Sequence, residues 1–334
     1  MRKIIGLLMV FMIMGSGLIQ AKKVATFTDI LKPGRMVIED DQIYITEDTT
    51  VYIYSSQDYR FIKKFGKAGE GPREFLRFVI VIPHQDHLII NSFGKISLYT
   101  REGEFIKEIK ASGGINFNYQ PLGKNYVGVS ISLEDNTRYE SINLYDSQLK
   151  KIKTILKRES DTQPTKNVIK ILNSTLQFLT FENKLYIVEG KEFVIKVYDM
   201  DVKELMVIKR DYDRVKFGEA DKQKIFKELE SNPRTKQYLD VLKKMAVFPD
   251  TYPAIVSIFQ RDDFIYAMTF RRQDDTYEFF IFDGNGNFLK KIFIPFVFQT
   301  AMTPYPFSIK DGKLYQLIEN EETEEWELYQ SEIK

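Results

Sequence analysis

VYIYSSQDYRFIKKF, residues 51–65, is the stretch that decides the fold, because the chain repeats its pattern several times. An apolar strand ends in Tyr or Phe, a polar turn follows, and a second strand begins near Phe-Ile-Lys. A fixed period of this kind is the sequence signature of a repeat architecture. The pattern returns, complete or truncated, at residues 96–109, 142–155, 195–208, 279–292 and 326–334, with the aromatic anchors Tyr54, Tyr99, Tyr145, Tyr198, Phe282 and Tyr329.

Each copy is preceded by two shorter apolar segments, such as RMVI at 35–38 and QIYIT at 42–46. Four short strands per unit at this spacing are typical of propeller blades. The sequence therefore predicts an all-β fold, a six-bladed β-propeller of four-stranded antiparallel blades. The sixth unit runs out of chain after three strands, so we expect residues 24–31 to supply its outer strand. Such closure would remove free sheet edges.

One interval between anchors, from Tyr198 to Phe282, is far longer than the others. Within it, residues 217–230 (FGEADKQKIFKELE) and 234–246 (RTKQYLDVLKKMA) both read as helices. In the second helix Tyr238, Leu242 and Met245 fall on one face at helical spacing. We therefore expect a helical hairpin, about residues 216–247, inserted between blades 4 and 5. Covering part of the propeller is the favoured role, and docking of a partner is the alternative.

The N-terminal residues have the features of a secretory signal peptide. Arg2 and Lys3 precede an apolar run that is too short for a comfortable membrane span, and Ala21 offers a small residue at its end. We expect residues 1–21 to be removed, leaving 22–334 as a single exported domain, periplasmic or extracellular. An uncleaved membrane anchor is the alternative.

Charge and cysteine content limit the classes of partner that the protein is expected to bind. Removal of two basic residues would change the formal charge from +1 to −1, since 46 basic residues would face 47 acidic ones. A near-neutral chain gives no electrostatic footprint for nucleic acid or anionic lipid. The chain has no cysteine, which excludes disulfides and a cysteine-linked lipid anchor. We expect a monomer with no nucleic-acid partner and no membrane span once the signal is removed.

A glycine-rich stretch, GKAGEGPREF at residues 66–75, resembles the signature of the bacterial secreted six-bladed β-propeller family, which is related to NHL-repeat proteins. FPDTYPA at 248–254, after the helical insertion, is also similar to many of its members. The resemblance covers residues 24–334. It implies the fold and implies little about activity.

The same glycines raise the question of a phosphate-binding loop. Such a loop needs a helix N-terminus behind it, and here the following PREFLRFVIVI reads as a strand. We therefore predict a connector that crosses from the rim of one blade to the centre of the next. It lies on the face where propellers usually bind ligands. Arg73 and Glu74 are candidate ligand-binding residues, with a structural salt bridge as the alternative.

Two motifs imitate metal sites. His84 and His87 flank Asp86 in HQDH, and Asp283, Asn285 and Asn287 begin a stretch that looks like a calcium loop. Both fall where the other units have polar turns, and the position for a bidentate Glu holds Ile294. We expect turns, and neither a metal nor a cofactor. The inner strands offer amides for the channel: Asn116, Asn118, Asn173 and Gln177.

Loops between the second and third strands of each unit supply the remaining candidate residues. They are polar, and those of units three, five and six are long and charged. A binding surface there would use Asn91, Arg138, Arg271 and Arg272, with the arginines facing an acidic cluster, Glu321, Glu322, Glu324 and Glu325. A solvated rim is the alternative.

These patterns favour a secreted or periplasmic binding module, rather than an enzyme, that recognises a peptide, glycan or small polar ligand on its loop face. A metal-dependent propeller hydrolase or lyase with a site in the central channel is the alternative. Such an enzyme would need several carboxylates or imidazoles converging on one point.

Overall fold

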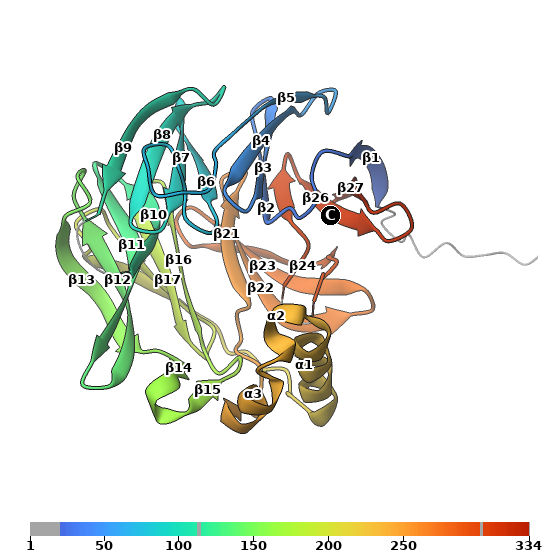
Figure 1. Cartoon of the computed structure of the whole chain (residues 1–334). Coiled ribbons are helices and arrows are strands. Elements are labelled where there is room, and N and C mark those ends of the chain that lie inside the picture. The colour runs from blue at the N-terminus through green and yellow to red at the C-terminus, as the bar shows by residue number, and fades with distance from the viewer. Residues whose placement is uncertain (1–20, 112–114, 301–302, 334) are drawn as a thin grey trace, which may run out of the picture.

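The computed structural model describes residues 21–333 apart from 112–114 and 301–302. The expected signal peptide lies outside the described residues, except for Ala21. The described chain forms six four-stranded antiparallel sheets and one three-stranded sheet. Figure 1 shows the six larger sheets following one another in chain order around a ring, so the fold is all-β and of the β-propeller type.

Strands that are neighbours in the orders given below are hydrogen-bonded to each other within their sheet. The first three sheets are β2 (Arg35–Glu39), β3 (Gln42–Glu47), β4 (Thr50–Ser55) and β5 (Phe61–Phe65); β6 (Ile80–His84), β7 (His87–Ser92), β8 (Lys95–Thr100) and β9 (Phe105–Lys110); and β10 (Ile115–Leu122), β11 (Asn125–Glu134), β12 (Thr137–Tyr145) and β13 (Lys151–Glu159). The next two are β16 (Thr175–Phe181), β17 (Lys184–Gly190), β18 (Val194–Tyr198) and β19 (Glu204–Lys209); and β21 (Ser257–Arg261), β22 (Phe264–Gln273), β23 (Thr276–Asp283) and β24 (Phe288–Pro295). The last joins β25 (Phe307–Lys310), β26 (Lys313–Asn320), β27 (Glu325–Glu332) and, from the other end of the chain, β1 (Lys22–Phe27).

The turns between third and fourth strands explain part of the repeat. In the fifth sheet Asp283 Oδ1 accepts hydrogen bonds from the backbone N–H groups of Asn285 at 2.9 Å and Asn287 at 2.8 Å. Asp146 and Asp199 bond their own turns in the same way. An Asp directly after the anchor aromatic therefore closes the hairpin through its side chain. DGNGN is a turn of this kind, as its place in the repeat predicted.

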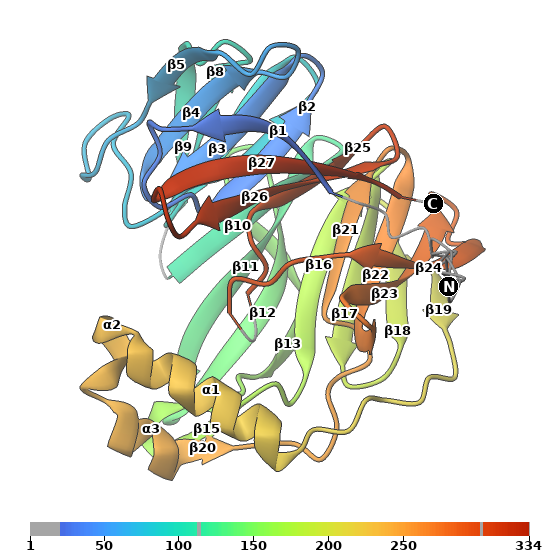
Figure 2. The ribbon, with the colours of Figure 1, turned by 90° about the vertical axis from the view of Figure 1, so that its right-hand side faces the viewer.

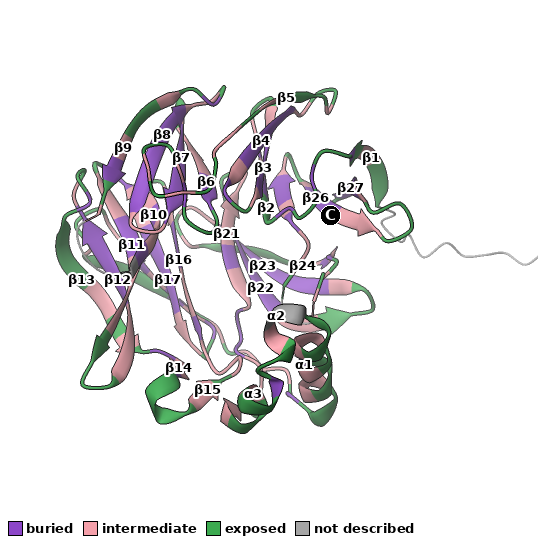
Figure 3. Ribbon diagram, in the orientation of Figure 1, coloured by how far each residue is buried: buried purple, intermediate pink, exposed green. Residues whose placement is uncertain are grey.

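The core lies between neighbouring sheets. Figure 3 shows the middle strands as the most buried, and β3 is buried along both faces because sheets pack against it on each side. One cluster joins Tyr44 and Ile53 of the first sheet to Leu88 and Ile90 of the second. Burial on both faces accounts for near-continuous apolar runs where a half-exposed sheet would show alternation.

The N-terminal segment completes the last sheet. β1 pairs antiparallel with β27, from Lys22 opposite Gln330 to Phe27 opposite Trp326. This is the outer-strand position expected from the sequence, but the strand spans Lys22–Phe27 rather than residues 24–31. Lys23 Nζ lies 2.7 Å from Glu327 Oε1, so an ion pair reinforces the closure. Figure 1 shows this N-terminal strand beside the C-terminal strand.

The long interval between β19 and β21 contains α1 (Glu219–Ser231), α2 (Pro233–Lys236) and α3 (Leu239–Met245). The single second helix expected from the sequence is wrong, because Tyr238 has φ −106° and ψ 6° and breaks it into two pieces. Tyr238 is also exposed, so it does not share a buried face with Leu239. Figure 2 shows the helices together below one end of the sheets.

A seventh sheet escaped sequence analysis. It joins β14 (Thr162–Gln163), β15 (Val168–Lys170) and β20 (Ala246–Val247), and a short 3₁₀ helix, Pro164–Lys166, lies between the first two. Strands of two or three residues carry no periodicity, and the parallel pairing of Ile169 with Ala246 joins distant segments. This sheet lies with the helices in Figure 2.

Candidate functional site

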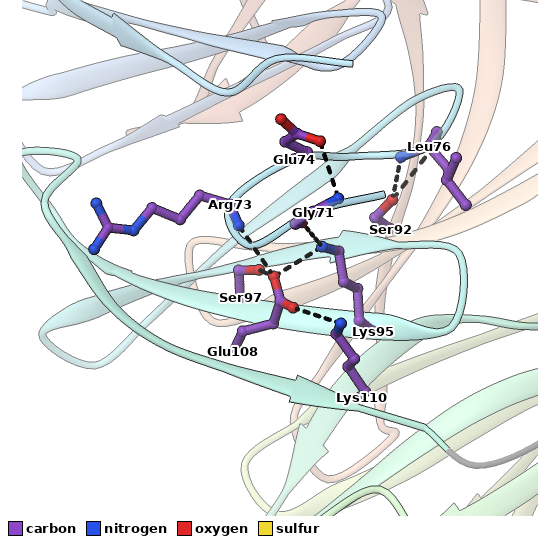
Figure 4. Close-up of polar contacts among 9 residues, drawn as sticks. All are labelled: Gly71, Arg73, Glu74, Leu76, Ser92, Lys95, Ser97, Glu108 and Lys110. Atoms are coloured by element: carbon purple, nitrogen blue, oxygen red, sulfur yellow. Dashed lines mark hydrogen bonds and ion pairs between the residues drawn. The ribbon is translucent and has the colours of Figure 1, made fainter. Parts of the chain in front are cut away.

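The glycine-rich connector is held by its own side chains (Figure 4). Gly71 N–H donates to Glu74 Oε2 at 2.9 Å. Lys67 Nζ lies 2.8 Å from Glu74 Oε1. These contacts, that of Lys67 first, hold the pKa of Glu74 below its usual value. Gly69 has φ 151°, a backbone conformation that strains any other residue, and a Cβ there would lie 2.0 Å from Glu74 Oε2. The chain continues through bends into strand β6, which fits a connector rather than a phosphate cradle.

Arg73 belongs to the same connector. Its backbone N–H lies 3.4 Å from Glu108 Oε2, and its guanidinium lies 4.6 Å from the centre of the Phe105 ring. Glu108 is paired with Lys95 at 2.8 Å. Burial acts to raise the pKa of Glu108, but Lys95 outweighs it and leaves the pKa lowered. Arg73 thus stacks on an outer strand, while Glu74 turns into the connector.

Asn91 lies inside the protein, with an exposed fraction of 1%. Its Nδ2 donates to Tyr119 O at 3.0 Å, and its Oδ1 accepts from Tyr119 N–H at 2.6 Å. Both ends of the amide are therefore used to join the second sheet to the third. The sequence placed Asn91 on a binding surface, and the structure gives it a different position, in the interior.

Arg138 lies apart from the other arginines. Its backbone N–H donates to Gln163 Oε1 at 2.9 Å, and its carbonyl accepts from Gln163 Nε2 at 2.7 Å, at the junction of β12 and β14. Within the described part of the chain, no ion pair joins Arg138, Arg271 or Arg272 to the acidic residues Glu321, Glu322, Glu324 and Glu325.

Arg271 and Arg272 lie together at a pocket between β22 and the inserted segment. The cavity has a volume of about 630 Å³, within the range of small-molecule sites. The segment that leads from β19 into α1 forms one wall, and the end of β22 forms the other. The lining residues are Asp213, Arg214, Val215, Lys216, Asp221, Lys224, Tyr252, Phe270, Arg271 and Arg272.

The pocket is strongly basic for a near-neutral protein. Five basic side chains and two carboxylates give its lining a formal charge of +3. Two of the five cations have partners outside the lining: Arg214 lies 3.7 Å from Glu192, and Arg271 lies 3.8 Å from Glu278. Lys216, Lys224 and Arg272 form no ion pair with any described residue. Unpaired cations gathered around a concave site attract anions.

Contacts below the surface fix the orientation of Arg271. Its Nη2 donates to Asp213 O at 2.6 Å, and its Nε lies 3.8 Å from Oε2 of Glu278, whose side chain is almost fully buried. Tyr212 and Thr269 both donate hydroxyl hydrogen bonds to that same carboxylate oxygen, at 3.0 and 2.9 Å. Arg271 is therefore held in place before any ligand arrives.

Aromatic rings form the apolar part of the lining. Tyr252 and Phe270 stack with centroids 4.1 Å apart, and the Arg272 guanidinium lies 4.4 Å from the centre of the Tyr277 ring. Burial, and then the neighbouring carboxylate of Asp221, raises the pKa of Tyr252, so its hydroxyl stays protonated. Asp221 Oδ2 also accepts the N–H of Gly218 at 2.8 Å, at the start of α1.

Sequence reasoning found two of the ten lining residues. Lys216, Lys224 and Tyr252 lie in segments that were read only as a helical insertion and its flank. Residues 216–230 hold four lysines and four acidic residues, so their composition gave no signal of a basic site. The sequence could not show that the fold brings this segment against β22.

The motifs that imitate metal sites are turns. His84 and His87 end and begin β6 and β7, and His87 Nδ1 lies 3.2 Å from Asp86 Oδ1. Among the described residues, no group of three or more His, Asp or Glu side chains is arranged to hold a metal ion.

Three of the four amides expected in the channel have protein partners. Asn116 Oδ1 accepts from Tyr145 at 3.0 Å, Asn173 donates to Asp161 at 3.1 Å, and Gln177 bonds the backbone of the next sheet. Asn118 lies at a bulge of β10 with φ 56°.

A second cavity, of about 590 Å³, lies at the other ends of the strands, beside the turns that start β22 and β26. Its lining includes Asp262, Asp263 and Asp311 together with Phe264 and Leu289.

None of the described helices is long and apolar enough to cross a membrane.

Comparisons with known proteins support the fold. No family model and no curated protein matches the chain. A solved structure described as a putative exported protein from Bacteroides fragilis is similar over 93% of both chains, with a TM-score of 0.57 and 10% sequence identity. The WD40 domain of Neurospora crassa Pan2 gives a TM-score of 0.44 with 6% identity, over 90% of this chain and 89% of that one. A protein of unknown function from Bacteroides caccae gives 0.40 with 9% identity, over 85% of each. At such identities the likeness concerns the fold alone, and the first of these structures carries it across nearly the whole chain.

Proposed function

We propose that the protein is an exported β-propeller that binds an anionic ligand in the pocket between β22 and the inserted segment. The observation that carries this proposal is the +3 lining of a pocket in which Lys216, Lys224 and Arg272 have no ion-pair partner. Of the ligands expected from the sequence, the proposal keeps those that bear negative charge: an acidic peptide, an acidic glycan or a small anionic molecule. Of the candidate residues, Arg271 and Arg272 belong to this site; Arg73, Glu74 and Arg138 lie elsewhere, and Asn91 is interior.

The architecture behind the proposal is a six-bladed ring. The six four-stranded sheets would be its blades, with the helices and the three-stranded sheet inserted between the fourth and fifth. A relation to NHL-repeat proteins belongs to the same proposal. Inner strands contact one another around the ring, from β25 to β2, β6, β10, β16 and β21, and Phe259 of β21 meets Phe307 of β25 at 5.2 Å.

Export is part of the proposal. A basic start, a short apolar run and Ala21 are the sequence features for it, and the similar Bacteroides fragilis protein is described as a putative exported protein. The mature protein would be residues 22–334, periplasmic or extracellular, and monomeric. The alternative of a metal-dependent hydrolase has no supporting group of residues in the described chain.

Thermal shift and calorimetric titration of residues 22–334 test the function. A panel of carboxylates, sugar acids, acidic peptides and their neutral counterparts would be compared on the native protein and on Arg271→Gln/Arg272→Gln. The proposal predicts that anions raise the melting temperature of the native protein and that the double variant loses the effect. Binding confined to neutral ligands, or binding unchanged in the variant, would contradict it.

A further inference from the structure

We infer that the ligand of this pocket is a dianion whose two charged groups are separated by an apolar spacer, so that it bridges the two walls. A linear α,ω-dicarboxylate has this chemistry. The inference rests on the proposed function, because it specifies the anion that the same pocket would take.

The first wall presents fixed cations. Arg271 is oriented by Asp213 O and by the buried Glu278 carboxylate, and Arg272 lies against the buried ring of Tyr277. Guanidinium groups held in one orientation lose little freedom when a carboxylate binds, and their planar fork suits two parallel hydrogen bonds. This wall is built to receive one anionic group.

The second wall presents separate cations from the inserted segment. Lys216 precedes α1 and Lys224 lies within it, and both are exposed and without an ion pair. The one carboxylate of α1 in the lining, Asp221, is already bonded to Gly218 N–H and lies beside the Tyr252 hydroxyl. The charge of the two lysines is therefore open to a ligand.

Charge and shape then specify the ligand. A single monoanion beside Arg272 would leave Lys216 and Lys224 without an ion-pair partner. The lining also contains the stacked Tyr252 and Phe270 rings and Val215, which favour methylene groups over water. A small inorganic ion such as phosphate would fill little of a cavity of about 630 Å³ and would leave this apolar surface uncovered. Two terminal anionic groups joined by a methylene chain satisfy all three features.

A bridging ligand has a second consequence. One wall belongs to a propeller strand and the other to a segment whose helices contact mainly each other. A ligand that bonds both walls would tie α1 to β22, whereas a monoanion on the arginines would leave α1 as it was. Backbone amide exchange in residues 219–231 reports on this tie directly.

The test compares matched pairs of acids by calorimetry on residues 22–334: butanoate with butanedioate, hexanoate with hexanedioate, and octanoate with octanedioate, with inorganic phosphate as a further probe. We expect one diacid to bind at least about tenfold more tightly than the monoacid of equal length, because a second charge-assisted contact forms. Arg271→Gln/Arg272→Gln and Lys216→Gln/Lys224→Gln should each abolish this preference. Lys227→Gln, an exposed lysine of α1 outside the lining, is the matched control and should retain it.

Three results would overturn the inference: equal affinities within each pair, phosphate binding as tightly as the best diacid, or unchanged diacid binding in Lys216→Gln/Lys224→Gln. Anions would still bind in these cases, so the proposed function would stand. If no acid of either series and no other anion binds, the proposed function itself fails. Hydrogen exchange supplies the second readout: the best diacid, and not its monoacid, should slow exchange in residues 219–231.

Discussion

Gln177 of β16 bonds the backbone of Ile258 on β21, in the next sheet of the ring. Its Oε1 accepts the Ile258 N–H at 3.0 Å, while its Nε2 donates to Val256 O at 2.5 Å. Asn91 joins the second and third sheets by the same two-ended contact. The side-chain amides of β7 and β16 therefore connect neighbouring sheets that no β-ladder joins.

These amides give a stability prediction. Gln177→Met keeps the size of the side chain and leaves Val256 O and Ile258 N–H without partners, which costs about 2–4 kcal/mol of unfolding free energy. Urea unfolding measures it. Gln237→Met, at an exposed position, is the control and should stay within about 0.5 kcal/mol of the native protein. Equal stability of the two variants would show that the inter-sheet bonds contribute nothing.

The closure of the last sheet should respond to pH. Hydrogen bonds from Lys23 first, then from Tyr329 and Asn320, lower the pKa of Glu327 to about 2. In the unfolded chain this pKa is about 4.3. The folded pKa is depressed, so the stabilisation is complete above pH ~5 and is lost as the pH falls toward 2.

We therefore expect the native protein to melt higher than Glu327→Gln at neutral pH, with the difference vanishing near pH 2. Lys23→Met should reduce the difference, whereas Lys22→Met, its exposed neighbour, should not. A difference in melting temperature that does not depend on pH would contradict this account of the ion pair.

The pairing of β1 with β27 has its own test. A chain that begins at Thr28 lacks β1 and the buried Phe27, so it exposes one edge of β27. Free edges pair with other chains. We expect lower thermal stability and oligomers in light scattering, compared with a monomeric chain that begins at Lys22. A truncated chain that is monomeric and equally stable would show that β1 is dispensable.

Alanine substitutions at two glycines distinguish the cost of a steric clash from the cost of an unfavourable backbone conformation. Gly66 has φ 92°, and a Cβ there would lie 2.4 Å from Thr49 O; Gly94 has φ 71° and open space around it. Gly94→Ala should cost about 1 kcal/mol, because its backbone conformation is unfavourable for alanine. Gly66→Ala should cost clearly more in the same urea titration. Equal costs would mean that the connector yields readily at Gly66.

The repeat made the four-stranded sheets predictable, because each buried strand carries an apolar run and each outer hairpin its own turn. Sequence reasoning misplaced elements where local conformation overrides the pattern. The strand expected in PREFLRFVIVI, residues 72–82, begins only at Ile80, since Arg77 has φ 62° and Phe78 N–H bonds back to Leu76 O. The two- and three-residue strands of the seventh sheet have no period to detect.

Only one of the two walls of the candidate site could be predicted from the sequence. Arg271 and Arg272 stood out as neighbouring charges at a loop. Their partners across the pocket, Lys216 and Lys224, lie some 50 residues earlier, and only the return of the inserted segment onto β22 brings them near. Asn91 was polar and close to a loop, and its backbone partner in the next sheet could not be deduced without the ring.

The central claim is that an anion binds between β22 and α1, and diffraction from crystals of residues 22–334 containing 2,3-dibromosuccinate tests it most directly. Bromine scatters anomalously, so an anomalous difference map distinguishes it from the lighter atoms of the protein and the solvent. We predict bromine peaks in the cavity lined by Arg272, Lys216 and Phe270, absent from crystals of Arg271→Gln/Arg272→Gln. Peaks only elsewhere, for example at the cavity beside Asp262 and Asp311, or no peaks at all, would contradict the claim.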